Sequence, residues 1–305
     1  MSGYVFAVTV AFFLALCSGG QALEVTIRYS APALGFTLPI HDRAVGAVAF
    51  HYIVKHAESN WEFQVYTNDP KNVFTTNGNL YLQPTLTVDD QRFDENFLRN
   101  GKMDMTQLFG YCTQSGNYGC VREGKYGLLP PVMSGKLKSV PTLRYGIVEV
   151  RARIPQGDWL WPAIWMMPKY ARYGNWPRSG EIDIMESRGN KGDIGIGTVT
   201  STLHWGPSPN ENKYYLTHGD KKSSSWANSF HTWRLEWTPD HLTTFVDNQQ
   251  IMRITPNFWQ KGGFSGGNIW ASGEKMAPFD QEFYLILNVA VGGTNGFFPD
   301  GNMWG

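Results

Sequence analysis

Charge is scarce in this chain of 305 residues: only 17% of them are charged, and 26 basic residues balance 26 acidic ones. The sequence also has no run of Lys or Arg. Because nucleic acids are bound through clustered positive charge, we expect no nucleic-acid partner. No stretch after residue 16 is apolar for the roughly 20 residues that a membrane helix needs, so we expect no membrane partner. The 42% of hydrophobic residues fit one large domain with a full core, and we expect a monomer.

Residues 1–22 have the pattern of a secretory signal peptide. Val5 to Leu16 is apolar apart from Thr9, and Gly20 and Ala22 place small residues where cleavage is expected. The apolar stretch is too short to span a bilayer. The sequence therefore predicts a secreted, extracellular protein.

Cysteine is rare, with 3 in the chain, and Cys17 lies within the predicted signal peptide. The other two, Cys112 and Cys120, favour a disulfide in an oxidising compartment, with two free thiols as the alternative. Closing so short a loop would stabilise the fold by about 2–3 kcal/mol. No cluster of His accompanies these cysteines, so we expect no zinc or other metal site and no cofactor. The sequence also lacks any Asn-X-Ser/Thr acceptor for N-glycosylation.

Helical periodicity of useful length is missing too, whereas alternating apolar residues recur along the chain. Residues 145–154 and 232–237 alternate with a period of two, and residues 283–291 are apolar on both faces of a strand. Asn77-Gly78 and Asp247-Asn248 separate apolar runs as hairpin turns do. Many short strands joined by turns predict an all-β sandwich or jelly roll.

One stretch carries three carboxylates within six residues: Glu181, Asp183 and Glu186. In a regular strand Glu181 and Asp183 point to the same face, and the two Ile residues between the acids point to the core. Glu186 lies at an odd offset, so a regular strand would send it to the core as well. A β-bulge near Ile184-Met185 would return it to the face of the other two acids.

Carboxylates that lie this close raise one another's pKa, so at least one could stay protonated near neutral pH. A protonated acid beside an ionised one is the pair that cleaves a glycosidic bond. Two alternatives remain open. The acids could form a solvent-facing strand edge, or they could bind a hard cation such as calcium, although ligands from a single strand would surround an ion poorly.

Residues 180–186 resemble the catalytic signature of glycoside hydrolase family 16, in the bulged form of the β-1,3-glucanases (laminarinases). Five further blocks, in the right order, are similar to animal members, including the β-glucan recognition proteins: residues 60–66, 146–155, 161–166, 203–207 and 283–293. The resemblance covers roughly residues 57–305. It implies a curved antiparallel β-jelly roll of the concanavalin A type, with a carbohydrate cleft on its concave face.

The resemblance also implies a role for each acid. Glu181 would be the nucleophile that forms a glycosyl-enzyme, and Glu186 would be the acid and then the base that activates water. Asp183 would form a hydrogen bond with Glu181 and keep the charges apart. This double displacement retains the anomeric configuration and requires the two Glu carboxyl groups to lie about 5–5.5 Å apart.

Indole rings suit a glucan cleft, because they bind the apolar faces of β-linked glucose and keep a polar N–H. The resemblance implies sugar contacts by five residues: Trp161, Trp165, Trp176, His204 and Asn60. Trp161 and Trp165 are four apart and share a strand face, although core packing is the alternative for any single Trp. Lys136 stands where the family has an Arg, and it lacks the planar two-point donor of that side chain.

Three segments are predicted along the chain: a signal peptide (residues 1–22), an N-terminal β segment (23–56) and a family 16 catalytic domain (57–305). The N-terminal β segment is similar to the opening of the β-glucan-binding module of the recognition proteins. It could equally supply the first strands of the main domain. Family members continue beyond the position of residue 305 with another strand, so we expect a truncated C-terminus.

Two functions compete on this reading. One is a secreted endo-β-1,3-glucanase that hydrolyses laminarin-type β-glucan, and the other is a non-catalytic β-1,3-glucan recognition protein of innate immunity. Recognition proteins of this type have generally replaced the acids, so the three carboxylates present here favour the enzyme. Transglycosylation, in which a second sugar takes the place of water, remains open, as does cleavage of mixed β-1,3/1,4-linked glucan.

Overall fold

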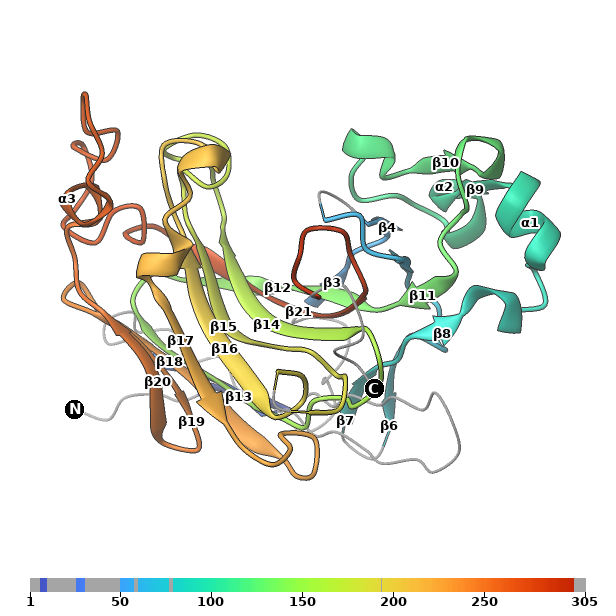
Figure 1. Cartoon of the computed structure of the whole chain (residues 1–305), viewed down its shortest axis with the longest axis horizontal. Helices are drawn as coiled ribbons and strands as arrows, with labels where there is room; N and C mark the ends of the chain where they lie inside the picture. The colour runs from blue at the N-terminus through green and yellow to red at the C-terminus, as the bar shows by residue number, and fades with distance from the viewer. Residues whose placement is uncertain are drawn as a thin grey trace.

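A computed structural model of the chain describes residues 6–9, 26–30 and 50–298, except residues 58–59, 77–78 and 193. Two large antiparallel sheets pack on one another, which confirms the predicted β-sandwich (Figure 1). The first sheet contains, in spatial order, β1 (Phe6–Thr9), β2 (Thr26–Ser30), β13 (Gly146–Ala152), β18 (His231–Trp237), β19 (Leu242–Val246) and β20 (Gln249–Ile254). The second contains β17 (His218–Lys222), β16 (Thr198–His204), β15 (Glu181–Ser187), β14 (Leu160–Pro168), β21 (Phe283–Val291), β12 (Lys136–Leu143) and β3 (Phe50–Tyr52).

The main core lies between these sheets and takes its side chains from alternate strand positions. In β13, Val148 and Val150 are fully buried, while the alternate residues Ile147, Glu149 and Arg151 are only half-buried. Ile182 and Ile184 of β15 are buried in the same core, as the alternation predicts. Strand β21 is buried along almost its whole length. Each such aliphatic side chain contributes about 1.5–3 kcal/mol, so the core holds β15 firmly from behind.

Both predicted hairpins are present. Strands β6 (Val73–Thr76) and β7 (Asn79–Leu82) pair Thr76 with Asn79, and the two turn residues lie outside the described part of the chain. Between β19 and β20, Asp247 and Asn248 have φ values of 47° and 65°. A two-residue turn of type I′ requires positive φ at both central positions, which Asn and Asp tolerate.

Strands from the predicted N-terminal β segment pair with both sheets. Strand β2 pairs with β13, and β3 pairs with β12. The strand suggested around residues 35–40 lies outside the described residues, as do residues 299–305. Strand β1 lies within the predicted signal peptide and pairs with β2. The division into domains, the signal peptide and the truncated C-terminus stay predictions.

A lobe beside the sandwich has an apolar cluster of its own, which includes Val54, Leu98 and Met105. Its strands are β4 (Lys55–His56), β5 (Gln64–Tyr66), β8 (Thr85–Leu86), β9 (Lys102–Asp104), β10 (Val121–Glu123) and β11 (Val132–Ser134). Its helices are α1 (Glu95–Asn100), α2 (Met105–Phe109) and the short 3₁₀ turns η1 (Thr87–Asp89), η2 (Gly116–Tyr118) and η3 (Gly124–Tyr126). The predicted disulfide between Cys112 and Cys120 is confirmed and lies in this lobe.

Local sequence explains the helices of the lobe. Asp94 accepts a hydrogen bond from the backbone N–H of Phe97 and begins α1, and Asp104 begins α2 in the same way. Gly110 follows α2 with a φ of 88°, a conformation that favours glycine. These helices have at most 6 residues, which agrees with the missing helical periodicity. No helix of the described residues is long and apolar enough to cross a membrane.

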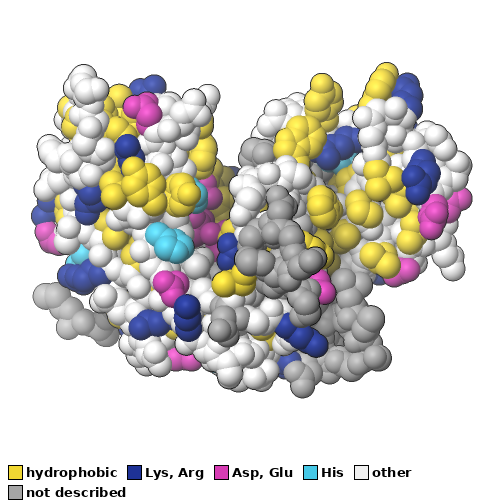
Figure 2. All heavy atoms as spheres, viewed as in Figure 1, with side chains coloured by type: hydrophobic (Ala, Val, Ile, Leu, Met, Phe, Trp, Pro, Cys, Tyr) yellow, Lys and Arg dark blue, Asp and Glu magenta, His cyan; other side chains and the backbone are white. Residues whose placement is uncertain are grey.

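The second sheet curves strongly along β14, β15 and β16 (Figure 1). The molecular surface is hollowed between this curved sheet and the lobe, and acidic side chains are visible in the wall of the hollow (Figure 2). Helix α3 (Phe258–Gly262) and the 3₁₀ turns η4 (Pro209–Glu211) and η5 (Tyr214–Leu216) lie in connections outside the sheets. The fold thus presents the middle of β15 to an open cleft.

Candidate active site

Strand β15 contains the predicted bulge. On the β14 side, consecutive residues Ile164 and Trp165 pair with Met185 and Asp183, so Ile184 is the extra residue. The register shifts at the same point against β16. The backbone carbonyl of Ile184 accepts a hydrogen bond of 2.6 Å from the hydroxyl of Ser201, so the bulge leaves it satisfied. The bulge therefore returns the side chain of Glu186 to the cleft face.

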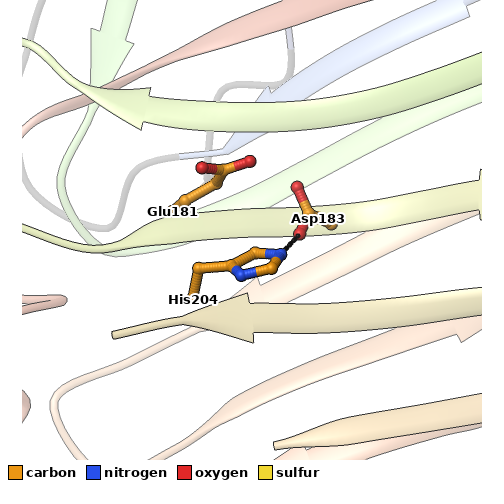
Figure 3. Close-up of side chains that lie close together, drawn as sticks. All are labelled: Glu181, Asp183 and His204. Carbon is orange, nitrogen blue, oxygen red and sulfur yellow. Dashed lines mark ion pairs between the residues drawn. The ribbon is translucent and has the colours of Figure 1, made fainter. Parts of the chain in front are cut away.

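Each of the three acids is held by a different nitrogen atom. Trp176 Nε1 donates to Glu181 Oε2 at 2.5 Å, and Trp161 Nε1 donates to Glu186 Oε1 at 2.8 Å. Asp183 Oδ2 lies 3.2 Å from Nε2 of His204, an ion-pair contact between β15 and β16 (Figure 3). The expected hydrogen bond between Asp183 and Glu181 is not among the contacts of the described residues, in which Asp183 pairs with His204.

Burial and crowding raise two carboxyl pKa values. Burial, followed by the charges of Glu181 and Glu186, raises the pKa of Asp183 well above its ordinary value. Burial also raises the pKa of Glu186, against the opposing effects of His204 and of the hydrogen bond from Trp161. A carboxyl group with a raised pKa is what a proton donor requires near neutral pH. Because these carboxyl groups interact, they titrate as one cluster and not as independent acids.

His204 competes with Asp183 for a proton. Burial lowers the pKa of His204, but Asp183 and the charges of Glu181 and Glu186 outweigh burial and raise it to about 9. That rise depends on Asp183 being ionised, whereas the cluster also raises the pKa of Asp183. One proton cannot be on Asp183 and on His204 at the same time. The surrounding hydrogen bonds therefore decide which of the two residues carries it.

The same three side chains, Glu181, Asp183 and His204, have ligand atoms within 4.8 Å of one another, a spacing that a metal ion could use. The Nε2 atom of His204 faces a carboxylate oxygen of Asp183, however, and such a contact is favourable when Nε2 carries a proton. A protonated nitrogen has no lone pair for a metal. The arrangement therefore fits proton sharing better than metal binding.

The three predicted cleft tryptophans differ in exposure. Trp176 is 40% exposed, and its ring lies 5.7 Å from that of His204. Trp165 is half-buried, and its Nε1 donates to Asn288 Oδ1 at 2.6 Å. Trp161 is only 8% exposed, and it stacks face to face on Phe297 with the ring centres 3.9 Å apart. Phe297 thus covers one face of Trp161, and what this indole presents to the acids is its N–H group.

Asn60 lies at the same end of the cleft as Trp161. Its backbone carbonyl accepts a hydrogen bond from Thr294 N at 2.8 Å. A Cβ atom placed on Gly293 would lie 3.3 Å from that carbonyl and 3.7 Å from the indole of Trp161, so both residues border this glycine. The Asn60 side chain reaches Glu62 Oε1 at 3.5 Å.

Lys136 lies over Trp165, with its Nζ 4.8 Å from the indole and 5.3 Å from the ring of Tyr66. Burial lowers the pKa of Lys136 to about 8, although attraction to Glu62 and Glu181 opposes the change. Burial and the charge of Lys136 lower the pKa of the neighbouring Lys55 to about 7. This side of the cleft thus holds two partly desolvated ammonium groups instead of a guanidinium.

Three residues that contribute to the site were not predicted from the sequence. Asn288 joins Trp165 to Tyr66, because its Nδ2 donates to the Tyr66 hydroxyl at 3.1 Å. Phe297 covers Trp161, and Asn212 contacts His204 with its Nδ2 2.8 Å from Nδ1. Asn288 falls within the block at residues 283–293, which gave a signal for it, whereas no motif marks Phe297 or Asn212.

Two carboxyl groups on one face of a cleft are the arrangement that glycoside hydrolases use. Residues 62–271 match the sequence model of the glycosyl hydrolases family 16. The chain belongs to this family, which confirms the resemblance.

Named relatives include both binding proteins and hydrolases. A β-1,3-glucan-binding protein of Penaeus monodon is 46% identical over 265 residues, which cover 82% of this chain and 72% of the relative. A glucan endo-1,3-β-glucosidase of Cryptopygus antarcticus is 39% identical over 164 residues, which cover 53% of this chain and only 56% of that relative. The solved laminarinase from Rhodothermus marinus has a TM-score of 0.56 and 27% identity, and the match covers 81% of each chain.

Proposed function

We propose that this protein is a secreted, endo-acting β-1,3-glucanase that hydrolyses laminarin-type β-glucan with retention of configuration. The observation that carries the proposal is the pairing of two glutamates in different environments. Desolvation raises the pKa of Glu186, a half-buried acid, and Glu181 accepts an N–H from Trp176 on the cleft face of the same strand. These are the two groups that double displacement needs.

In the first step, a carboxylate oxygen of Glu181 attacks the anomeric carbon while Glu186 gives its proton to the departing glycosidic oxygen. The indole N–H of Trp176 can only donate, so it supports the ionised form of the nucleophile. In the second step Glu186, now ionised, takes a proton from water, and the resulting hydroxide oxygen replaces Glu181 at the anomeric carbon. The Trp161 N–H stabilises Glu186 in this ionised phase.

An open cleft supports internal cleavage of a polymer. The surface is hollowed between the curved sheet and the lobe (Figure 2). Trp176, which is 40% exposed, offers a ring face beside Glu181, and Lys136 and Trp165 offer polar and aromatic contacts further along. Names of relatives that mention β-1,3-glucan support this polymer as the ligand.

The second candidate is a β-1,3-glucan-binding protein that does not cut, and the name of the Penaeus monodon relative favours it. Release of reducing sugar from laminarin separates the two. The proposal expects release that is lost in Glu181→Gln, together with laminarin binding that persists in this variant. Tight binding of laminarin without any release by the unaltered protein would establish the second candidate instead.

A further inference from the structure

The two ring nitrogens of His204 face different kinds of atoms. Nε2 lies 3.2 Å from a carboxylate oxygen of Asp183, and Nδ1 lies 2.8 Å from Nδ2 of Asn212. An amide nitrogen carries two N–H donors and has no lone pair to offer. Nδ1 can therefore form this hydrogen bond only when it carries no proton of its own.

The orientation of the Asn212 amide is set from the other side. The backbone N–H of Trp205 lies 3.2 Å from Asn212 Oδ1. A backbone N–H can only donate, so the amide oxygen must face Trp205 and the NH₂ group must face His204. Reversing the amide would place donor against donor at Trp205.

The loop after His204 is built to hold Asn212 in place. Lys213 N donates to the carbonyl of Trp205 at 2.9 Å, which closes the loop around residues 206–212. A Cβ atom on Gly206 would lie 2.3 Å from the carbonyl oxygen of Glu211, so only glycine permits this close return of the chain. The amide therefore belongs to a fixed structure beside the imidazole.

We propose that Asn212 is a positioning residue that keeps Nδ1 of His204 unprotonated, so that the proton drawn in by the three acids sits on Asp183. His204 is then neutral with its proton on Nε2, which faces Oδ2 of Asp183 at 3.2 Å. The other oxygen of Asp183 lies on the side of Glu181 (Figure 3). In the proposed arrangement this oxygen carries the shared proton. The catalytic meaning of this arrangement rests on the function proposed above.

The alternative arrangement has the same total charge but a different location of one proton. A charged His204 would have N–H on both nitrogens, and Nδ1–H would meet the NH₂ group of Asn212. Asp183 would then be ionised and paired with the charged ring of His204, and it would turn a negative charge toward Glu181. Moving the proton from Nδ1 of His204 to Asp183 replaces that charge by a hydrogen-bond donor that faces Glu181.

Nitrogen NMR of the histidine rings tests the location of the proton without reference to activity. In ¹⁵N-labelled protein at pH 7, we expect His204 to show one protonated and one unprotonated nitrogen, with Nε2 as the protonated one. His204→Gln identifies the signal. Asn212→Asp retains an oxygen for Trp205 N–H but turns a carboxylate toward Nδ1, so both nitrogens of His204 become protonated.

Asn210→Asp is the matched control, because Asn210 lies on the same loop, is exposed and gains the same charge. It should leave the His204 signals as they are. A wild-type spectrum with both nitrogens protonated at pH 7 overturns the inference, whether or not the Asn212 variant folds. An Asn212→Asp protein that keeps the wild-type signals overturns it as well.

Kinetics test the catalytic consequence. In Asn212→Asp we expect kcat on laminarin to fall about 10- to 100-fold, with laminarin binding changed by less than about twofold. Asn210→Asp should retain both. An unchanged kcat in a variant whose His204 has become charged overturns the positioning role. If the unaltered protein shows the expected nitrogen pattern but releases no sugar, the proposed hydrolysis fails while the assignment of the proton stands.

Discussion

Glu181 and Glu186 are both held by an indole N–H, yet the two indole–carboxylate pairs differ in almost every other respect. Trp176 is 40% exposed, whereas Trp161 is 8% exposed and covered by Phe297. Burial raises the pKa of Glu186, the carboxyl group held by the covered indole. The surroundings of the second pair, more than its hydrogen bond, thus support the role of acid that we propose for Glu186.

Removing either carboxylate should have the largest effect on activity. Glu181→Gln removes the nucleophile, and we expect kcat on laminarin to fall about 10⁴-fold or more. Glu186→Gln removes the proton donor, and a loss of about 10²–10⁴-fold is expected. An aryl β-glucoside of laminaribiose with a good leaving group distinguishes the two, because its departure needs little protonation. Glu186→Gln should still release the aryl group in a burst, while a burst from Glu181→Gln would contradict the assigned roles.

Trp161→Phe sharpens the comparison through pH. Glu186 must be protonated to act as the acid, so hydrolysis should fall as pH rises through its raised pKa. The hydrogen bond from Trp161 favours ionised Glu186, and removing it should raise that pKa further and move the basic limb of kcat/KM to higher pH.

Trp176→Phe is the matched control for this shift, since it removes the same N–H from the other glutamate. It should lower kcat about tenfold through loss of positioning and leave the basic limb where it is. The assignment of Glu186 as the acid is wrong if Trp176→Phe moves the basic limb and Trp161→Phe does not.

Lys136→Arg tests whether the cleft beyond the two indole–carboxylate pairs contributes to laminarin binding. The lowered pKa of Lys136, about 8, means that it is charged below this pH and loses its charge above it. We therefore expect KM for laminarin to rise in the wild type between pH 7 and 9. The Arg variant should show a flat KM over this range and a value a few-fold lower at pH 7, because a guanidinium stays charged and donates at two points. Identical KM profiles would show that Lys136 does not bind the glucan.

The smallest effect on activity is expected from the disulfide in the lobe. Cys112→Ser with Cys120→Ser should lower the free energy of unfolding by about 2–3 kcal/mol, because the unfolded chain loses a short constraint. Both indole–carboxylate pairs lie outside the lobe, so kcat should stay within about twofold of the wild type. Thermal unfolding and laminarin kinetics on the same preparation measure both quantities. A large loss of kcat at a temperature where the variant is folded would show that the lobe shapes the reactive centre.

The strands and the bulge were predictable, because they follow from the pattern of apolar and polar residues along the sequence. The period-two pattern predicts β13 and β18, the apolar run predicts β21, and the odd offset of Glu186 predicts a bulge near Ile184-Met185. In each case the relevant signal lies within a few consecutive residues.

Contacts between distant segments were not predictable in the same way. The resemblance predicts a sugar contact for Trp161, which stays a prediction. No local pattern indicates that Phe297, from the connection after β21, covers one face of its ring. Asn212 has no motif of its own, since its importance comes from where a tight loop places it relative to His204. Side-chain coverage and amide orientation depend on tertiary packing that no local pattern records.

The bulge in β15 also bears on how this strand can change length. Adding one residue to a strand ordinarily turns every later side chain to the opposite face. Here the bulge absorbs the extra residue, so deletion of Ile184 should give a regular strand that still presents Glu181, Asp183 and Glu186 on one face, at offsets of zero, two and four. The face on which the three acids lie is thus compatible with two strand lengths.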